Sequence, residues 1–145
     1  MLAVLFLLGP LTEAYASSDP VAEYRALIAR LEGLFFPEPA KVAQVIANGR
    51  PTLLGFLDRG CSSCLRMVPA LEALQKEIGG EVNILVIDLD DLGKNPTVDL
   101  LAKQYKVWAG PQFVLFDKRG KMVGKLFGPK SREELIGRLR KLIAQ

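Results

Sequence analysis

The sequence predicts one α/β domain in which helices flank a central mixed β-sheet. An apolar run at residues 52–57, a helical pattern at 61–78 and a second apolar run at 82–89 have the spacing of a right-handed βαβ unit. Two further apolar stretches, 112–116 and 122–127, flank a turn that ends in glycine and predict an antiparallel hairpin. A chain of 145 residues, half of them apolar, has enough material for one compact core.

The N-terminal residues have the features of a secretory signal peptide, which we place at residues 1–16. Residues 2–8 are apolar, Gly9 and Pro10 interrupt them, and Ala14-Tyr15-Ala16 is a small-x-small cleavage site. No Lys or Arg precedes the apolar run, so only the α-amino group supplies positive charge there. The run is far shorter than the roughly 20 residues that span a bilayer. The sequence therefore predicts an extracytoplasmic protein, periplasmic or secreted, where disulfides form and persist.

A helical extension is expected at residues 17–39, before the main domain at 40–145. Asp19 is a suitable N-cap, Pro20 suits the first helical position, and apolar residues recur at helical spacing up to residue 34. Phe35 and Phe36 precede a proline-rich break, and we expect them to form a hydrophobic plug at the helix end rather than a partner-binding patch.

Three more helices complete the expected order. A short helix is predicted at residues 40–47, another at 97–105 and an amphipathic one from Ser131 to residue 143, where Ser131 and Glu134 form a capping box. No repeat or low-complexity segment separates them.

The two cysteines of the chain, Cys61 and Cys64, stand at the start of a predicted helix, directly after a predicted strand. Two thiols in a first helical turn are close enough to form a disulfide with little backbone movement. Free amide donors and the helix dipole there favour the thiolate of the first cysteine. Arg59 and Arg66 flank the pair and either could support a thiolate, although solvated surface arginines are more common. The arrangement predicts a redox-active thiol pair.

Composition argues against several other sites. A structural zinc site takes four Cys or His ligands, and this chain has two cysteines and no histidine. Haem attachment fails because Leu65 stands where the required histidine would follow the second cysteine. The net charge of +3 is scattered along the chain, so no nucleic-acid surface is expected. We expect no metal and no cofactor, since a dithiol carries its own electrons.

From residue 40 to its end, the chain resembles thioredoxin-like proteins. The matching features, in chain order, are the C-x-x-C pair, Pro69 inside the following helix, Tyr105-Lys106-Val107, Pro111 before a strand, Gly120 in the hairpin turn and Gly128 before the last helix. A single C-x-x-C is a weak signal, but the ordered set is a strong one.

The resemblance implies a role for each matched position. Cys61 would be the attacking thiolate and Cys64 the resolving thiol. Pro111 would follow a cis peptide bond, and Gly110 would pair with an extended substrate strand. Trp108 would border the substrate groove, either as a half-buried packing residue or as an exposed aromatic that contacts substrate.

The sequence departs from the family pattern beside the cysteines. Gly60 replaces an aromatic residue, Ser62 and Ser63 replace Gly-Pro, and Gln112 replaces threonine. Ser62, Ser63 and Pro69 are therefore expected to support the pair, Pro69 by kinking the helix.

The family's buried carboxylate is also missing, because Gly55 occupies its position. That carboxylate accepts the proton of the resolving thiol in the family. A substitute base for Cys64 could be Asp58, or an acid among residues 88–91, and the sequence does not choose between them.

Two functions remain after these observations. The first is an exported thiol–disulfide oxidoreductase, a monomer that exchanges electrons with cysteines of extracytoplasmic proteins and with a membrane electron donor or acceptor. The resemblance favours a reductant over an oxidant. The alternative is a non-catalytic binding or chaperone module with a static disulfide, which the short loop argues against because closing it removes little unfolded-state entropy. A metal-delivery role is disfavoured by the missing histidine.

Overall fold

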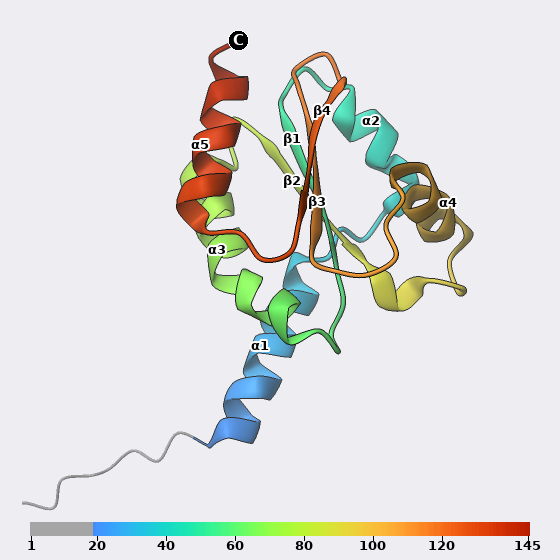
Figure 1. Cartoon of the computed structure of the whole chain (residues 1–145), viewed down its shortest axis with the longest axis vertical. Coiled ribbons are helices and arrows are strands. Elements are labelled where there is room, and N and C mark those ends of the chain that lie inside the picture. The colour runs from blue at the N-terminus through green and yellow to red at the C-terminus, as the bar shows by residue number, and fades with distance from the viewer. Residues whose placement is uncertain (1–18) are drawn as a thin grey trace, which may run out of the picture.

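The computed structural model describes residues 19–145 and shows a four-stranded sheet between two layers of helices (Figure 1). The strand order is β2-β1-β3-β4. Strands β1 and β2 are parallel, whereas β3 is antiparallel to both β1 and β4. The strands are β1 (Thr52–Leu57), β2 (Asn83–Asp88), β3 (Gln112–Phe116) and β4 (Met122–Phe127). The expected mixed sheet with flanking helices is therefore confirmed.

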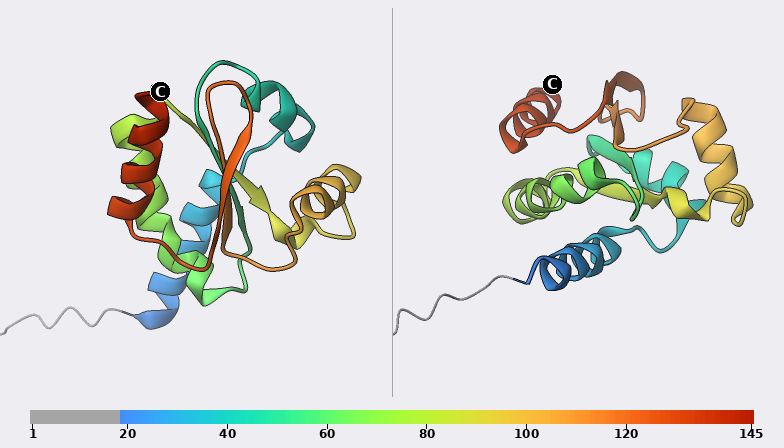
Figure 2. Two further views of the ribbon diagram at one scale, coloured as in Figure 1. Left: turned by 45° about the horizontal axis from the view of Figure 1, so that its top comes forward. Right: turned by 60° about the horizontal axis from the view of Figure 1, so that its bottom comes forward.

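Helices cover both faces of the sheet, as Figures 1 and 2 show. One face carries α1 (Pro20–Leu34), α3 (Ser62–Ile78) and α5 (Arg132–Ile143). The other face carries α2 (Val42–Ile46) and α4 (Pro96–Tyr105), together with the short 3-10 turns η1 (Pro39–Lys41) and η2 (Leu89–Asp91). Each layer forms its own apolar core against the sheet.

Strand β1 lies at the centre of the fold and brings the chain to the candidate site. All six of its residues are buried, which explains why it reads as an uninterrupted apolar run. Phe56, near its end, pairs with Gln112 at the start of β3. The loop that follows β1 and the loop that precedes β3 therefore meet at the same end of the sheet.

Helix α1 packs along α3 through its second half. Leu31 is fully buried in the shared core, and Arg30 forms an ion pair with Glu72 of α3 at 2.7 Å. Asp19 caps the helix by accepting the N–H of Val21. The first turns are exposed and extend beyond the body of the domain (Figure 1). The signal peptide expected at residues 1–16 lies outside the described residues. Within the described part of the chain, no helix has the length and apolarity needed to cross a membrane.

Phe35 and Phe36 connect α1 to the free edge of the sheet. The N–H of Phe36 donates to the carbonyl of Val86 in β2 at 2.7 Å, and Phe35 forms an isolated parallel bridge with the same residue. Phe35 packs against one core and Phe36 against the other. These contacts match the expected hydrophobic plug.

Several element boundaries differ slightly from the sequence prediction. Strand β2 is shorter at each end because Val82 donates its N–H to Ile78 at the end of α3, and Leu89 begins a 3-10 turn. The Asp88 side chain caps that turn. The short helix predicted at 40–47 is instead a 3-10 turn that continues into α2.

Candidate active site

The two thiols lie at the N-terminus of α3 with unequal exposure. Cys61 is the N-cap residue, and its Sγ accepts the N–H of Cys64 at 3.2 Å. Both thiols are free; Cys61 is partly exposed, whereas Cys64 is completely buried. The Cys61 sulfur is therefore accessible to solvent, and the Cys64 sulfur is not.

The loop before β3 covers this pair. The Cys61 thiol donates to the carbonyl oxygen of Gly110 at 3.5 Å, and the peptide bond between Gly110 and Pro111 is cis. A Cβ placed on Gly110 would lie 2.8 Å from the Cys64 Sγ and 2.7 Å from the carbonyl oxygen of Phe56. These distances are too short for any side chain, so the close approach of this loop requires glycine. The sequence suggested Gly110 only by resemblance and carried no sign of this contact.

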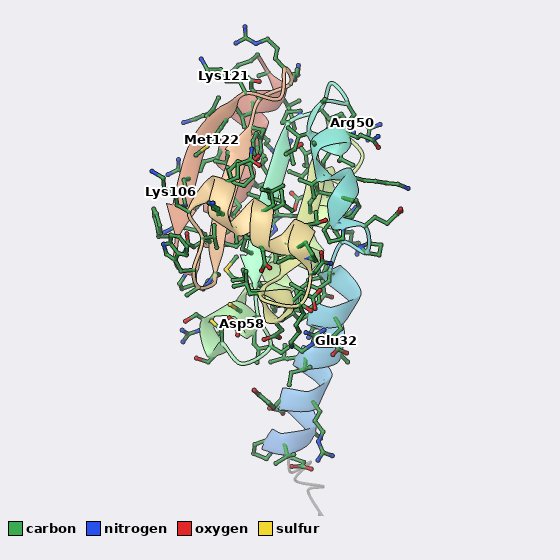
Figure 3. The ribbon with its side chains drawn as sticks, turned by 90° about the vertical axis from the view of Figure 1, so that its right-hand side faces the viewer. Glu32, Arg50, Asp58, Lys106, Lys121 and Met122 are labelled. Atoms are coloured by element: carbon green, nitrogen blue, oxygen red, sulfur yellow. The ribbon has the colours of Figure 1, made fainter. Side chains whose placement is uncertain are left out.

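The carboxylate of Asp58 lies close to both sulfurs. A carboxylate oxygen of Asp58 and the two Sγ atoms all lie within 4.8 Å of one another, and Figure 3 shows Asp58 beside the first turn of α3. The backbone N–H groups of Gly60 and Cys61 donate to this carboxylate. Two thiols and one carboxylate make three potential metal ligands, one fewer than a structural zinc site takes.

Burial raises the pKa of both Asp58 and Cys64. It raises the pKa of Asp58, and the nearby charge of Asp90 raises it further. Burial also raises the pKa of the Cys64 thiol, helped by its hydrogen bond with Cys61, while the backbone of Asp58 opposes the shift. Cys64 is therefore protonated at neutral pH and needs a base before it can act as a nucleophile.

Arg59 does not serve the thiolate, contrary to one expectation from the sequence. Its Nη1 donates to Asp88 at 2.6 Å and to Asp90 at 3.0 Å, and its Nε donates to Glu32 of α1 at 2.8 Å. The guanidinium also lies 4.9 Å from the ring centre of Phe35. Because three carboxylates occupy it, Arg59 ties the cysteine loop to α1 and to the end of β2.

The predicted supporting residues lie on the outer side of α3. Arg66 donates to the Ser63 hydroxyl at 3.0 Å, and Ser62 is exposed. Pro69 lies inside the helix on its exposed side, where it removes one backbone N–H. None of these groups is near enough to the sulfurs to form a hydrogen bond that the structure records. Arg66 therefore faces solvent, as the common case predicts.

Gly55 is tightly packed against the neighbouring strand. A Cβ there would lie 3.1 Å from the ring of Phe113 on the neighbouring strand. A side chain at this position would therefore require the side chains of Phe113 and Leu57 to move by a few tenths of an ångström.

Trp108 is exposed rather than half-buried, with 74% of its surface accessible. Gln112 anchors the loop that carries Trp108, because its Nε2 donates to the carbonyl oxygen of Ala109 at 2.7 Å. Sequence reasoning noted Gln112 only as a departure and missed this anchoring bond, which a local pattern cannot reveal. Trp108 is therefore exposed, and its contact with substrate stays a prediction.

Comparison with known proteins identifies the family of the chain. The profile of a thioredoxin-like domain family matches residues 39–143. A thiol:disulfide interchange protein TxlA homolog of Synechocystis is 33% identical over 103 residues, covering 71% of this chain and 55% of that protein. Thioredoxin X, chloroplastic, of Arabidopsis thaliana is 38% identical over 90 residues, covering 62% of this chain and 43% of that protein. The chain thus spans about half the length of these relatives.

A solved structure shows the same fold. Mitochondrial thioredoxin 3 of Saccharomyces cerevisiae, in its oxidized form, superposes with a TM-score of 0.62 at 22% identity and covers 77% of this chain and 98% of its own. The strand order and the position of the two thiols define an α/β domain with a cysteine pair at the N-terminus of α3. The chain belongs to the thioredoxin-like domain family.

Proposed function

We propose that this protein is a thiol–disulfide oxidoreductase that exchanges electrons with cysteines of other proteins through Cys61 and Cys64. The observation that carries the proposal is the asymmetry of the pair: one sulfur is accessible and hydrogen-bonded to a backbone N–H, and the other is buried 3 residues further along the same helix. An accessible nucleophile with a sheltered partner is what a two-step exchange requires. The relatives named above include a thiol:disulfide interchange protein, which supports the same activity.

The reaction follows from this asymmetry. The Cys61 thiolate attacks one sulfur of a client disulfide, which forms a mixed disulfide and releases the other client sulfur as a thiolate. The N–H of Cys64 that points at the Cys61 Sγ stabilises negative charge there before the attack. Cys64 then attacks Cys61, which closes the intramolecular disulfide and frees the client as a dithiol. Two electrons pass from the protein to the client.

The loop beside the pair is the proposed client-binding surface. Gly110 and Pro111 lie next to Cys61, whose thiol donates to the Gly110 carbonyl oxygen. Trp108, which is exposed, offers an aromatic surface at the border of the same loop. An extended segment around the client cysteine is the shape that fits this surface.

We further propose that the protein works outside the cytoplasm as a monomeric reductant, with cysteine-containing extracytoplasmic clients and a membrane electron donor. The apolar run and small-x-small site at the N-terminus support export. Sequencing the N-terminus of the protein recovered from cell fractions tests this. A chain recovered outside the cytoplasm that begins near Ser17 is expected, and an uncleaved chain in the cytoplasm contradicts it.

Trapping the mixed disulfide tests the activity directly. The Cys64→Ser variant is expected to accumulate a covalent adduct with a disulfide-bonded peptide, whereas Cys61→Ser forms none because its remaining thiol is buried. The unmodified protein should reduce the same peptide completely. If it reduces no peptide and neither variant is trapped, the pair is a static disulfide in a binding module and the proposed activity is wrong.

A further inference from the structure

The resolving step needs a proton acceptor that no motif of the chain assigns. Cys64 is completely buried, so its thiol is not in direct contact with bulk water. A thiol attacks a disulfide only as the thiolate, so a group beside Cys64 must take this proton first. The inference below rests on the oxidoreductase activity proposed above.

The acids at the end of β2 are already engaged. Asp88 and Asp90 both bind the guanidinium of Arg59, at 2.6 and 3.0 Å. Asp88 also accepts the N–H of Asp90 at 3.0 Å, and Asp90 accepts the N–H of Arg59 at 3.1 Å. The carboxylate oxygens of both acids are therefore already occupied by Arg59 and by backbone donors.

Asp58 has the geometry that these acids lack. Within the described residues, its carboxylate oxygen is the one grouped with both sulfurs, all within 4.8 Å. Among residues 19–145, the Asp58 carboxylate has no salt bridge to a Lys or Arg, although the neighbouring Arg59 is paired three times. Backbone hydrogen bonds from Gly60 and Cys61 hold the carboxylate in place. A fixed, partly buried carboxylate beside a buried thiol is placed to receive its proton.

We propose that Asp58 is the catalytic base of the resolving step and takes the proton of Cys64. In the mixed disulfide, the thiol proton of Cys64 moves to the Asp58 carboxylate. The Cys64 thiolate attacks the Cys61 Sγ, the new Cys61–Cys64 bond forms, and the bond between Cys61 and the client breaks. The departing client thiolate takes the proton from the Asp58 carboxylic acid, which restores the carboxylate.

The surroundings of Asp58 support this role. The charged and titratable groups that face it are the two thiols of α3, Asp88 at the end of β2, Asp90 in η2 and the paired Arg59 of its own loop. Burial, followed by the charge of Asp90, raises the pKa of Asp58. A stronger base lies closer in proton affinity to a thiol, so the transfer is less uphill than it would be to an exposed carboxylate.

A two-phase reaction with dithiobis(nitrobenzoate) separates the two chemical steps. Attack by Cys61 releases the first coloured thiolate, and resolution by Cys64 releases the second. In buffer with a metal chelator, the Asp58→Asn variant of the full chain is expected to slow the second phase by about a hundredfold or more relative to the first, which is the lower end of what a positioned base contributes. Its second-phase rate should also lose the dependence on pH that the carboxylate gives the unmodified protein.

Two further variants make the result specific. Asp91→Asn removes one negative charge from the nearby acidic segment at residues 88–91, and Asp91 is not grouped with the sulfurs, so both phases of this variant should match the unmodified protein. Asp58→Glu keeps a carboxylate and should recover part of the second-phase rate and its pH dependence. Circular dichroism checks that every variant is folded.

The outcomes distinguish this inference from the proposed activity. If the second phase of Asp58→Asn keeps the rate and pH profile of the unmodified protein, Asp58 is not the base although the oxidoreductase stands. If the unmodified protein itself releases no second thiolate, the proposed activity fails and the inference fails with it. A second phase slowed equally by Asp91→Asn also overturns the role of Asp58, because the effect would then be one of general charge.

Discussion

Gly110→Ala tests the closeness of the two loops that form the site. The new Cβ would lie 2.7 Å from the carbonyl oxygen of Phe56 and 2.8 Å from the Cys64 Sγ, where carbon contacts are ordinarily about 3.5–4.0 Å. Phe56 belongs to the central strand, which is paired on both sides and cannot yield. The loop or Cys64 must therefore shift by roughly 1 Å.

The expected cost follows from overpacking. Forcing one extra methyl group into such a contact costs about 2–3 kcal/mol of unfolding free energy, at the upper end of the usual range because backbone forms one wall. In a domain of this size that lowers Tm by on the order of 10 °C. Because the displaced group includes the Cys64 sulfur, the resolving step should slow as well.

Urea denaturation followed by circular dichroism measures the loss of stability. The matched control is Gly137→Ala in α5, where a new Cβ meets nothing within 4 Å and better helix propensity should add about 0.5–1 kcal/mol. If Gly110→Ala unfolds at the same urea concentration as the unmodified protein and resolves mixed disulfides at the same rate, the loops are not packed as described and the reasoning is wrong.

Three other changes follow from the same structure. Arg59→Ala leaves Asp88, whose side chain is only 12% exposed, without its guanidinium partner and should lower the unfolding free energy by about 2 kcal/mol. Its control is Arg30→Ala, which breaks a single exposed ion pair and should cost less than about 0.5 kcal/mol when both variants are unfolded in urea. Leu31→Ala should cost about 2–5 kcal/mol, because this fully buried side chain attaches α1 to the core; calorimetry showing no change in Tm would mean that α1 is not part of the folded unit. Burial raises the pKa of Asp58 above 3.8, so ionisation of this group lowers the unfolding free energy as pH rises through the folded-state pKa. Asp58→Asn should therefore be more stable than the unmodified protein at neutral pH and lose that advantage below about pH 3.8. Urea midpoints measured across pH would show this.

Most of the fold could be predicted from the sequence, because most helices and strands are marked by local patterns of apolar and capping residues. β1 is buried on both faces and so is apolar throughout, and the helix caps at Asp19 and Ser131 are formed by the side chains that the sequence suggested. The boundaries of β2 were less accurate, because Val82 and Leu89 are apolar enough for a strand but their backbones are used by α3 and η2. Hydrophobicity does not report which hydrogen bond a residue makes.

The site was readable only where it is local. The spacing of Cys61 and Cys64 fixes their proximity within one helical turn, and the structure places them there. The role of Arg59 depends instead on Glu32 and Asp88, 27 and 29 residues away, and no periodic pattern carries such information. The choice of Asp58 over the later acids likewise depends on which carboxylates another side chain already occupies.

The reduction potential of the Cys61–Cys64 pair, titrated in glutathione and dithiothreitol buffers and read by thiol alkylation, tests the central claim most directly. A redox-active pair in a reductant is expected to equilibrate near the potential of thioredoxin, about −270 mV, and a value near −120 mV would instead mark an oxidant of the same class. A pair that stays oxidised well below about −300 mV would be a structural disulfide, and the oxidoreductase account would be wrong.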